Sequence, residues 1–295
     1  MTGIITASSG GLYTVETGEG SVQCRARGVF RHKHEKVVVG DRVELTQDGE
    51  GTVISAICER KNVLIRPPMA NLDYIFVTAA ASMPSPDPFM LDKLTTIAEY
   101  NKIKPVIIIG KCELDRERAA ELCGIYRLAG YDAFCVSCHE GEGIDAVKKY
   151  IDGLPAGSIS AFAGASGVGK SSLMNLLFPG LSLETSSVSH KTERGRHTTR
   201  SVTLYPSGAG YIADTPGFSM LDFEHFDFFT KDDLPDTFPE FADLLGTCKY
   251  TKCSHTKEDG CAILAAVRAG KIARSRHDSY LALYEILKNK HAWDK

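Results

Sequence analysis

Residues 164–171 read G-A-S-G-V-G-K-S and fit the pattern G-x-x-x-x-G-K-[ST]. The preceding residues, 158–163, can form a short buried strand, and residues 172–178 carry apolar side chains at helical spacing before Pro179-Gly180. Strand, glycine-rich loop and helix in this order are the context in which the pattern binds phosphate. The glycines let successive N–H groups turn toward a phosphate at the positive end of the helix. The sequence therefore predicts a nucleotide phosphate site.

Individual positions of this loop have predictable roles. We expect Lys170 to reach the β- and γ-phosphates and the Ser171 hydroxyl to take one position around Mg²⁺. The phosphate-binding residues predicted from the pattern are Gly164, Ala165, Ser166, Gly167, Val168, Gly169, Lys170, Ser171 and Ser172.

Residues 1–66 have the pattern of a small β domain. Glycine-rich turns separate five β-type runs, at residues 3–6, 12–15, 21–24, 36–39 and 51–54. Five short strands without a helical period are typical of an oligonucleotide-binding (OB-type) β-barrel. Residues 25–36 hold five Lys/Arg and two His against one Glu. This basic loop favours contact with a phosphate backbone, and a solvated surface loop is the alternative.

After Arg66-Pro67-Pro68, which marks a domain boundary, buried strands alternate with helices in the manner of α/β folds. Strands are predicted at 73–79 and 105–109, with a helix at 89–100 between them.

The second of these strands leads into G-K-C-E-L, where guanine-binding GTPases carry N-K-x-D. Lys111 fits, whereas Gly110 replaces Asn and Glu113 replaces Asp. A Glu carboxylate can still accept both donors of the guanine edge, although an ordinary βα loop is the alternative and the strength of guanine selectivity stays open. A further strand at 133–136 precedes S-C-H, which is similar to the S-A-K loop behind the guanine. The predicted base-binding residues are Gly110, Lys111, Cys112, Glu113, Ser137 and Cys138.

Downstream, a strand at 210–213 leads into D-T-P-G, which fits D-x-x-G. Asp214 would hold Mg²⁺ through water, and the Gly217 amide would sense the γ-phosphate. Thr199, which we favour over Thr198, would complete the Mg²⁺ shell.

The base motifs thus precede the phosphate loop, whereas in ordinary small GTPases they come last. This order predicts a circularly permuted GTPase domain over residues 67–222, so that the second switch can act on a following domain.

Phe218 occupies the position where many GTPases carry a water-orienting Gln. His197 is the best internal candidate for a catalytic group, because a neutral imidazole can orient or deprotonate water. The alternative is a loop histidine that contacts a partner or solvent. We expect slow intrinsic turnover that a bound partner accelerates.

Residues 223–295 contain the pattern C-x4-C-x-H-x5-C. Three thiolates and one imidazole form a closed tetrahedral shell, typical of one structural Zn²⁺. The predicted ligands are Cys248, Cys253, His255 and Cys261. Helices are predicted at 262–269 and 277–288, so this domain is expected to be mostly helical.

Composition and charge indicate the chemistry of the cysteines, the cellular compartment and the kind of partner. The chain of 295 residues has nine cysteines and a net charge of −3, and its uneven cysteine spacing favours thiols and a metal site over a disulfide framework. Absence of a signal segment or an apolar run of membrane-span length predicts a cytoplasmic protein without membrane contact. From residue 248 onward, the chain has ten Lys/Arg and only five acidic residues, so this basic segment can contact an anionic polymer. We expect a monomer.

Together these motifs closely resemble the ribosome small-subunit-dependent GTPase A family (RsgA, also called YjeQ or EngC). The resemblance covers essentially the whole chain, through the barrel, G-A-S-G-V-G-K-S-S, G-R-H-T-T, D-T-P-G-F and the Cys/His pattern in this order. It implies a bacterial cytoplasmic GTPase that binds the small ribosomal subunit late in its maturation and is stimulated by it to hydrolyse GTP to GDP and phosphate. It also implies that barrel and zinc domain contact ribosomal RNA and that His197 serves catalysis.

Two other functions remain open at this stage. One is a nucleic-acid-binding module whose nucleotide site is a switch with negligible hydrolysis, which Phe218 favours. The other is an ATPase or a kinase, which would require adenine to be preferred over guanine.

Overall fold

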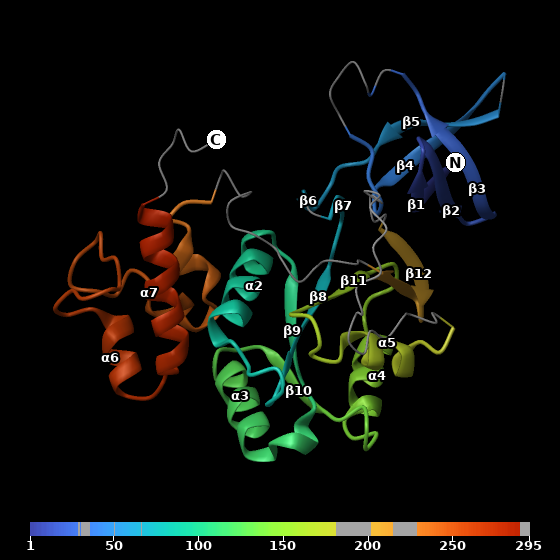
Figure 1. Ribbon diagram of the computed structural model, residues 1–295. Coiled ribbons are helices and arrows are strands. Elements are labelled where there is room, and N and C mark those ends of the chain that lie inside the picture. The colour runs from blue at the N-terminus through green and yellow to red at the C-terminus, as the bar shows by residue number, and fades with distance from the viewer. Residues whose placement is uncertain are drawn as a thin grey trace, which may run out of the picture.

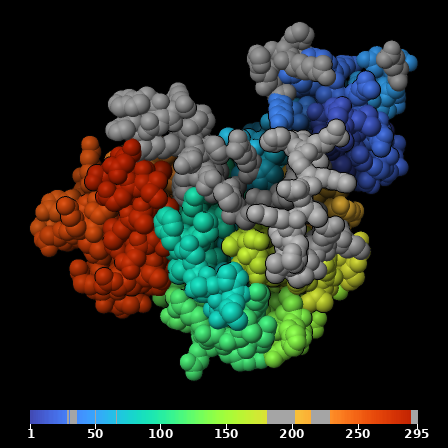
Figure 2. Space-filling view, viewed as in Figure 1, coloured from blue at the N-terminus to red at the C-terminus, as the bar shows by residue number. Residues whose placement is uncertain are grey.

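The structure is a computed structural model, which describes residues 1–28, 30, 36–49, 51–65, 67–180, 202–214 and 229–289. Figure 1 shows an N-terminal β-barrel, a central sheet with helices on its faces, and a helical C-terminal unit beside α2. In the space-filling view of Figure 2, the blue barrel and the orange-to-red C-terminal unit lie on opposite flanks of the central domain. Among the described residues, no helix has both the length and the apolar character of a membrane span.

The barrel consists of β1 (Thr2–Ser9), β2 (Leu12–Thr17), β3 (Gly20–Ala26), β4 (Arg42–Asp48) and β5 (Gly51–Ile57). It closes because β1 pairs with both β2 and β4, while β3 pairs in parallel with β5. The inward side chains of Ile5, Val15, Val43 and Ile54 are fully buried, as alternation along half-buried strands requires. The predicted five-stranded OB-type barrel is therefore confirmed.

The strand predicted at residues 36–39 is wrong, because the fourth barrel strand begins only at Arg42. In the predicted run, Val39 forms an isolated bridge to Met69. Gly40 then turns with φ +89°, and the buried Asp41 carboxylate accepts a hydrogen bond from the Val38 N–H at 2.8 Å. The valines are buried in a connection, so an apolar β-branched run did not identify a ladder strand.

The central sheet has the order β10 (Asp132–Val136), β9 (Lys104–Gly110), β8 (Tyr74–Ala80), β11 (Ile159–Ala163), β13 (Gly210–Asp214) and β12 (Thr203–Ser207). Its strands are parallel except for β12, which pairs antiparallel with β13. One residue pair, Ala7 with Thr203, continues the ladder into the barrel. A short hairpin, β6 (Val63–Leu64) with β7 (Met69–Ala70), connects the two domains.

Helices cover both faces of this sheet. The helices are α2 (Pro88–Tyr100), α3 (Arg116–Leu128), α4 (Ile144–Asp152) and α5 (Lys170–Leu177), with a short 3₁₀ turn η1 (Cys112–Leu114) before α3. One buried cluster joins Ile107 and Ile109 of β9 to α2 and α3, and a second joins the alternate residues Val106 and Ile108 to α4 and α5. The fully apolar run of β9 follows from burial on both faces.

The C-terminal unit contains η3 (Leu234–Thr237), η4 (Pro239–Leu244), α6 (Ala262–Arg268) and α7 (Arg274–Lys288). Both predicted helices are present, and α7 begins three residues before the predicted start. Tyr280, Leu283 and Leu287 of α7 are buried, and α7 packs against α2. The apolar stripe of α7 is therefore a packing surface.

Candidate nucleotide-binding site and metal centre

The glycine-rich loop lies between β11 and the start of α5 at Lys170. Gly164 has φ +138°, and a Cβ atom at this position would lie 2.0 Å from the Thr78 carbonyl oxygen on β8. Gly169, with φ +103°, precedes the first residue of α5. These positions require glycine, and the resulting loop places the N-terminus of α5 at the carboxyl edge of the sheet.

Lys170 lies over its own loop. Its Nζ donates to the carbonyl oxygens of Gly164 at 2.7 Å and Ala165 at 2.6 Å. Burial lowers the pKa of this ammonium group. An anionic phosphate would offset that desolvation, which makes the position of Lys170 suitable for phosphate binding.

A cavity of about 460 Å³ joins the phosphate loop to the predicted base-binding loops. Its volume is within the range of small-molecule pockets, roughly 300–1,000 Å³. The cavity is lined by Thr78, Gly110, Lys111, Glu113, Leu114, Val136, Cys138, His139, Val168, Gly169, Ser172 and Leu173. Segments far apart in the chain, after β9, after β10 and after β11, thus meet in one hollow at the carboxyl ends of parallel strands.

Glu113 lines this cavity, and its carboxylate carries an unsatisfied acceptor. Its Oε2 atom is buried and has no hydrogen-bond partner in the part of the chain that the structure describes. Burial alone would raise the pKa of Glu113, but the hydrogen bond from the Ser137 hydroxyl and its own backbone N–H lower it. The carboxylate is therefore ionised at neutral pH and able to accept hydrogen bonds from a ligand.

Backbone geometry constrains two residues near Glu113, namely Gly110 and Lys111. A Cβ at Gly110 would lie 3.1 Å from the Val168 carbonyl oxygen, so the base-binding loop and the phosphate loop approach closely where the related motif carries Asn. Lys111 adopts φ +55°, and its Nζ donates to the Met83 carbonyl at 2.6 Å. Its stem thus extends along the rim of the cavity.

The remaining predicted nucleotide residues occupy different places. Cys112 and Ser137 are buried behind the cavity, and Ser171 lies in the first turn of α5. Ala165, Ser166 and Gly167 form the exposed tip of the phosphate loop. Asp214 ends β13, whose Ala213 pairs with Ala161 of β11, so it ends at the same sheet edge. His197, Thr199 and Gly217 lie outside the described residues.

Sequence reasoning missed five cavity residues, Thr78, Leu114, Val136, His139 and Leu173. Val136 directly precedes the predicted Ser137. Thr78 could have been found from its position near the carboxyl end of a strand adjacent to β11. Leu173 could have been found from its place on the first turn of the helix after the phosphate loop. Leu114 and His139 directly follow residues that were predicted.

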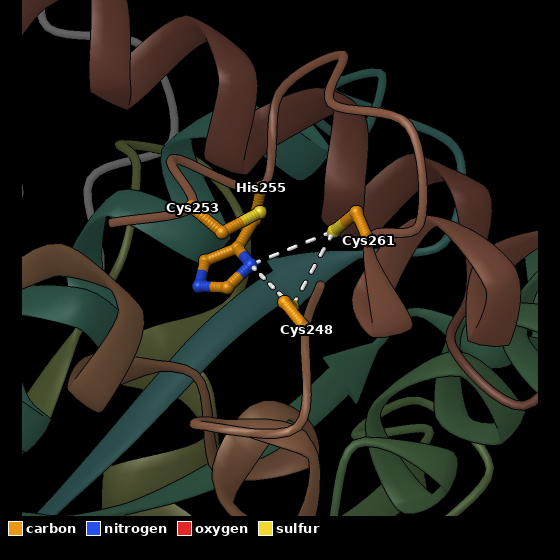
Figure 3. A group of neighbouring side chains, drawn as sticks. All are labelled: Cys248, Cys253, His255 and Cys261. Carbon is orange, nitrogen blue, oxygen red and sulfur yellow. Dashed lines mark hydrogen bonds between the residues drawn. The ribbon is translucent and has the colours of Figure 1, made fainter. Parts of the chain in front are cut away.

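The predicted metal ligands are brought together in the C-terminal unit. One ligand atom from each of Cys248, Cys253, His255 and Cys261 lies within 4.8 Å of the others. Figure 3 shows the four side chains pointing toward one another. The His255 Nδ1 atom lies 3.6 Å from Cys248 Sγ and 3.5 Å from Cys261 Sγ. Three soft sulfur donors and one imidazole can hold a metal ion, and this donor set fits tetrahedral zinc.

The surroundings stabilise this arrangement. The Ala262 N–H donates to Cys248 Sγ at 3.3 Å, and the His277 Nε2–H donates to the His255 carbonyl oxygen at 2.9 Å. Desolvation, together with hydrogen bonds to the other thiols, raises the pKa of Cys253 to about 12. A cation among these sulfurs would reverse that shift by stabilising thiolates.

Glu258 organises the loop between the ligands. Its carboxylate accepts hydrogen bonds from the backbone N–H groups of Ser254, Thr256 and Lys257 and from the Ser254 hydroxyl. Although burial alone would raise the pKa of Glu258, these bonds lower it to about 2. These hydrogen bonds therefore fix the backbone of the loop between the ligands.

Known proteins match this chain over almost its full length. The family model described as RsgA GTPase matches residues 57–224, and that of the RsgA N-terminal domain matches residues 2–54. A protein of Moorella thermoacetica named small ribosomal subunit biogenesis GTPase RsgA is 42% identical over 298 residues, covering 99% of this chain and 100% of its own. The protein of the same name from Halalkalibacterium halodurans is 40% identical and covers 98% of each chain.

Two solved structures have the same fold. YjeQ from Thermotoga maritima superimposes with a TM-score of 0.83 at 34% identity, covering 98% of this chain and 99% of that one. YloQ, described as a circularly permuted GTPase, gives a TM-score of 0.80 at 32% identity, covering 98% and 96%. The order of the loops around the cavity agrees with a circular permutation, since the segments after β9 and β10 precede the phosphate loop in the chain. The chain therefore belongs to the RsgA GTPase family and is a circularly permuted GTPase.

Proposed function

We propose that this GTPase acts in biogenesis of the small ribosomal subunit, binding the subunit and its rRNA and hydrolysing GTP to GDP and phosphate under its stimulation. The name shared by its relatives supports the ribosomal role. The observation that carries the nucleotide chemistry is the cavity that the phosphate loop and Glu113 line together.

Guanine suits this cavity better than adenine. Its Watson–Crick edge offers two neighbouring donors, an N1–H and an exocyclic amine, which the two oxygens of the Glu113 carboxylate can accept. Adenine offers one donor and one acceptor on the same edge, so its acceptor nitrogen would face a carboxylate oxygen and leave that oxygen without a donor. Lys111, Cys138 and the buried Ser137 would complete the base site, with Ser137 holding Glu113 in position.

At the phosphate end, residues 164–172, which include Lys170, would hold the nucleotide. Ser171 and Thr199 would bind Mg²⁺ directly, and Asp214 would bind it through water. The bound Mg²⁺ would supply charge neutralisation at the β- and γ-phosphates. Gly217 would sense the γ-phosphate, and His197 would orient or deprotonate the attacking water. His197, Thr199 and Gly217 stand in this proposal on the sequence pattern alone.

The three domains have distinct parts in this function. Residues 1–66 and 223–295 would contact rRNA, and residues 67–222 would bind and hydrolyse GTP. One structural Zn²⁺ would hold the loops of the C-terminal unit through its three cysteines and one histidine. The protein would act as a monomer, in the cytoplasm, where the small ribosomal subunit is assembled.

The decisive test is multiple-turnover GTP hydrolysis by purified protein, with and without purified small ribosomal subunits, for wild type and His197→Ala. We expect strong stimulation by the subunit and loss of at least about 100-fold in the variant, as for removal of a general base, with GDP affinity retained. Absence of stimulation would favour the nucleic-acid-binding switch. Stimulation that survives the substitution would assign the catalytic group elsewhere.

A second test concerns the metal. Chelation of purified protein should release one zinc per chain and lower the unfolding temperature of the C-terminal unit. Cys261→Ser should reproduce this loss, whereas Cys24→Ser, at a buried cysteine of the barrel, should retain zinc. Zinc retained by Cys261→Ser at wild-type affinity would contradict the assignment.

A further inference from the structure

Two cysteine thiols lie in direct contact where α3 packs against β10. Cys123 of α3 is fully buried, Cys135 of β10 is half-buried, and their Sγ atoms lie 2.8 Å apart. A disulfide bond is about 2.05 Å long, so the sulfurs need to approach by only about 0.8 Å to be joined. Neither thiol belongs to the C-terminal metal centre.

The two elements that carry these thiols also position the base site. η1, with Glu113, leads directly into α3, and β10 leads directly into Ser137 and Cys138. A covalent link between Cys123 and Cys135 would therefore tie together the supports of the two base-binding loops.

We propose that Cys123 and Cys135 form a reversible dithiol–disulfide pair that hydroperoxides oxidise. Such pairs in reducing compartments are transient and respond to oxidants rather than stabilising the fold. This inference goes beyond the proposed ribosomal function and does not depend on it.

The surroundings assign a role to each sulfur. The hydrogen bond from Cys123, followed by the charge of Arg127, lowers the pKa of Cys135, while the same hydrogen bond and burial raise that of Cys123. Cys135 is also the more exposed of the two. Cys135 is thus the attacking thiolate and Cys123 the resolving thiol.

The reaction balances in two steps. The Cys135 thiolate attacks one oxygen of hydrogen peroxide, the O–O bond breaks, and Cys135 becomes a sulfenic acid as hydroxide leaves. Cys123 then attacks the Cys135 sulfur, the S–O bond breaks, and the hydroxyl leaves as water with the Cys123 proton. Two thiols are oxidised, and one peroxide is reduced to two waters.

A third thiol lies close enough to compete. Cys112 of η1 is buried, and the negative charges of Glu142 and Cys135 add to burial in raising its pKa. Its raised pKa keeps it protonated, so it is a poorer nucleophile than Cys135. The structure gives a sulfur–sulfur contact for Cys123 with Cys135, which is why this pair is proposed.

The test treats zinc-loaded full-length protein with one equivalent of hydrogen peroxide, followed by alkylation of free thiols and peptide mass mapping. We expect a peptide linked through Cys123 and Cys135, loss of two thiols per peroxide, and full recovery with dithiothreitol. Cys135 should react at least about fivefold faster than Cys24, whose pKa burial raises.

Two variants sharpen the result. Cys123→Ser should abolish the link and leave Cys135 as sulfenic or sulfinic acid, whereas Cys24→Ser should leave the link unchanged. The proposal is overturned if Cys135 pairs with Cys112 or Cys138, or if oxidation is confined to the metal-centre cysteines. Absence of the linked peptide from wild type after peroxide is consumed also overturns it, whatever the variants do.

Discussion

Glu113 is the residue on which the proposed guanine recognition rests. Its Oε2 atom is buried and lacks a hydrogen-bond partner among the described residues, so it is an acceptor that a ligand with donors can satisfy. Glu113→Gln removes the negative charge and replaces one acceptor by a donor. We predict that GDP affinity falls by about 10- to 100-fold, the worth of hydrogen bonds to a charged group.

Titration with a fluorescent GDP analogue measures this change. Glu140→Gln is the matched control, because Glu140 pairs with Arg116 on the surface and does not line the cavity. Because the pKa of Glu113 is lowered from 4.5, the carboxylate is ionised throughout the neutral range. The ratio of wild-type to variant affinity should therefore stay constant between about pH 6 and pH 8. Equal GDP affinity for Glu113→Gln and wild type would remove Glu113 from the base site.

Two glycines of the phosphate loop separate a steric requirement from a conformational one. A methyl group at Gly164 would meet the Thr78 carbonyl at 2.0 Å, whereas one at Gly167 would meet nothing within 4 Å although its φ is +79°. We predict that Gly164→Ala lowers the free energy of unfolding by roughly 2–6 kcal/mol. Gly167→Ala should cost only about 1–2 kcal/mol. Urea denaturation of both variants checks this, and equal losses would disprove the close approach of β8 to the loop.

At the scale of elements, α7 is joined to the GTPase domain through the buried Arg276. Its guanidinium donates to Asp92 on α2 and to Glu240 on η4, both at 2.7 Å, and lies 4.6 Å from the ring centroid of Phe238. Burial penalises this charge, but the two carboxylates keep its pKa well above the ordinary value. The guanidinium is thus paired with two carboxylates in an ion network inside the interface. Among the described residues, Asp92 Oδ2 has no hydrogen-bond partner, and burial raises the pKa of Asp92.

Removing Arg276 leaves both carboxylates buried without their partner. We predict that Arg276→Met lowers the free energy of unfolding by about 3–5 kcal/mol. Arg274→Met, two residues away on α7 and 84% exposed, should change it by no more than about 0.5 kcal/mol. Urea unfolding followed by circular dichroism compares the two. Similar small losses in both would mean that the network does not hold α7 in place.

Features that depend on residues close together in the chain could be predicted from the sequence, whereas long-range contacts could not. The phosphate loop and the Cys/His pattern were predictable because each needs residues only a few positions apart. The Arg276 network was not, since Asp92 lies 184 residues and Glu240 36 residues from Arg276. Likewise, Val39 pairs with Met69 and accepts a hydrogen bond from the Ala70 N–H, contacts that no local pattern encodes. The position of Glu113 was predictable, whereas its unpaired oxygen required the fold.

At the scale of the whole molecule, two flanking units are attached to one nucleotide domain. The barrel continues the central sheet through Ala7 and Thr203, and Arg42 donates to the Gly157 carbonyl at 3.1 Å just before β11. On the other flank, the ion network joins the C-terminal unit to α2. Binding of GTP or GDP can therefore be transmitted to both proposed rRNA-binding units.

The most direct test of this coupling compares binding to small ribosomal subunits in the presence of two different nucleotides. Purified protein is incubated with small ribosomal subunits in the presence of either a non-hydrolysable GTP analogue or GDP, and the bound fraction is determined by sedimentation. We predict tighter binding with the GTP analogue, by about 5- to 150-fold as for a typical coupling free energy. Equal binding with both nucleotides would contradict a GTPase that acts on the small subunit.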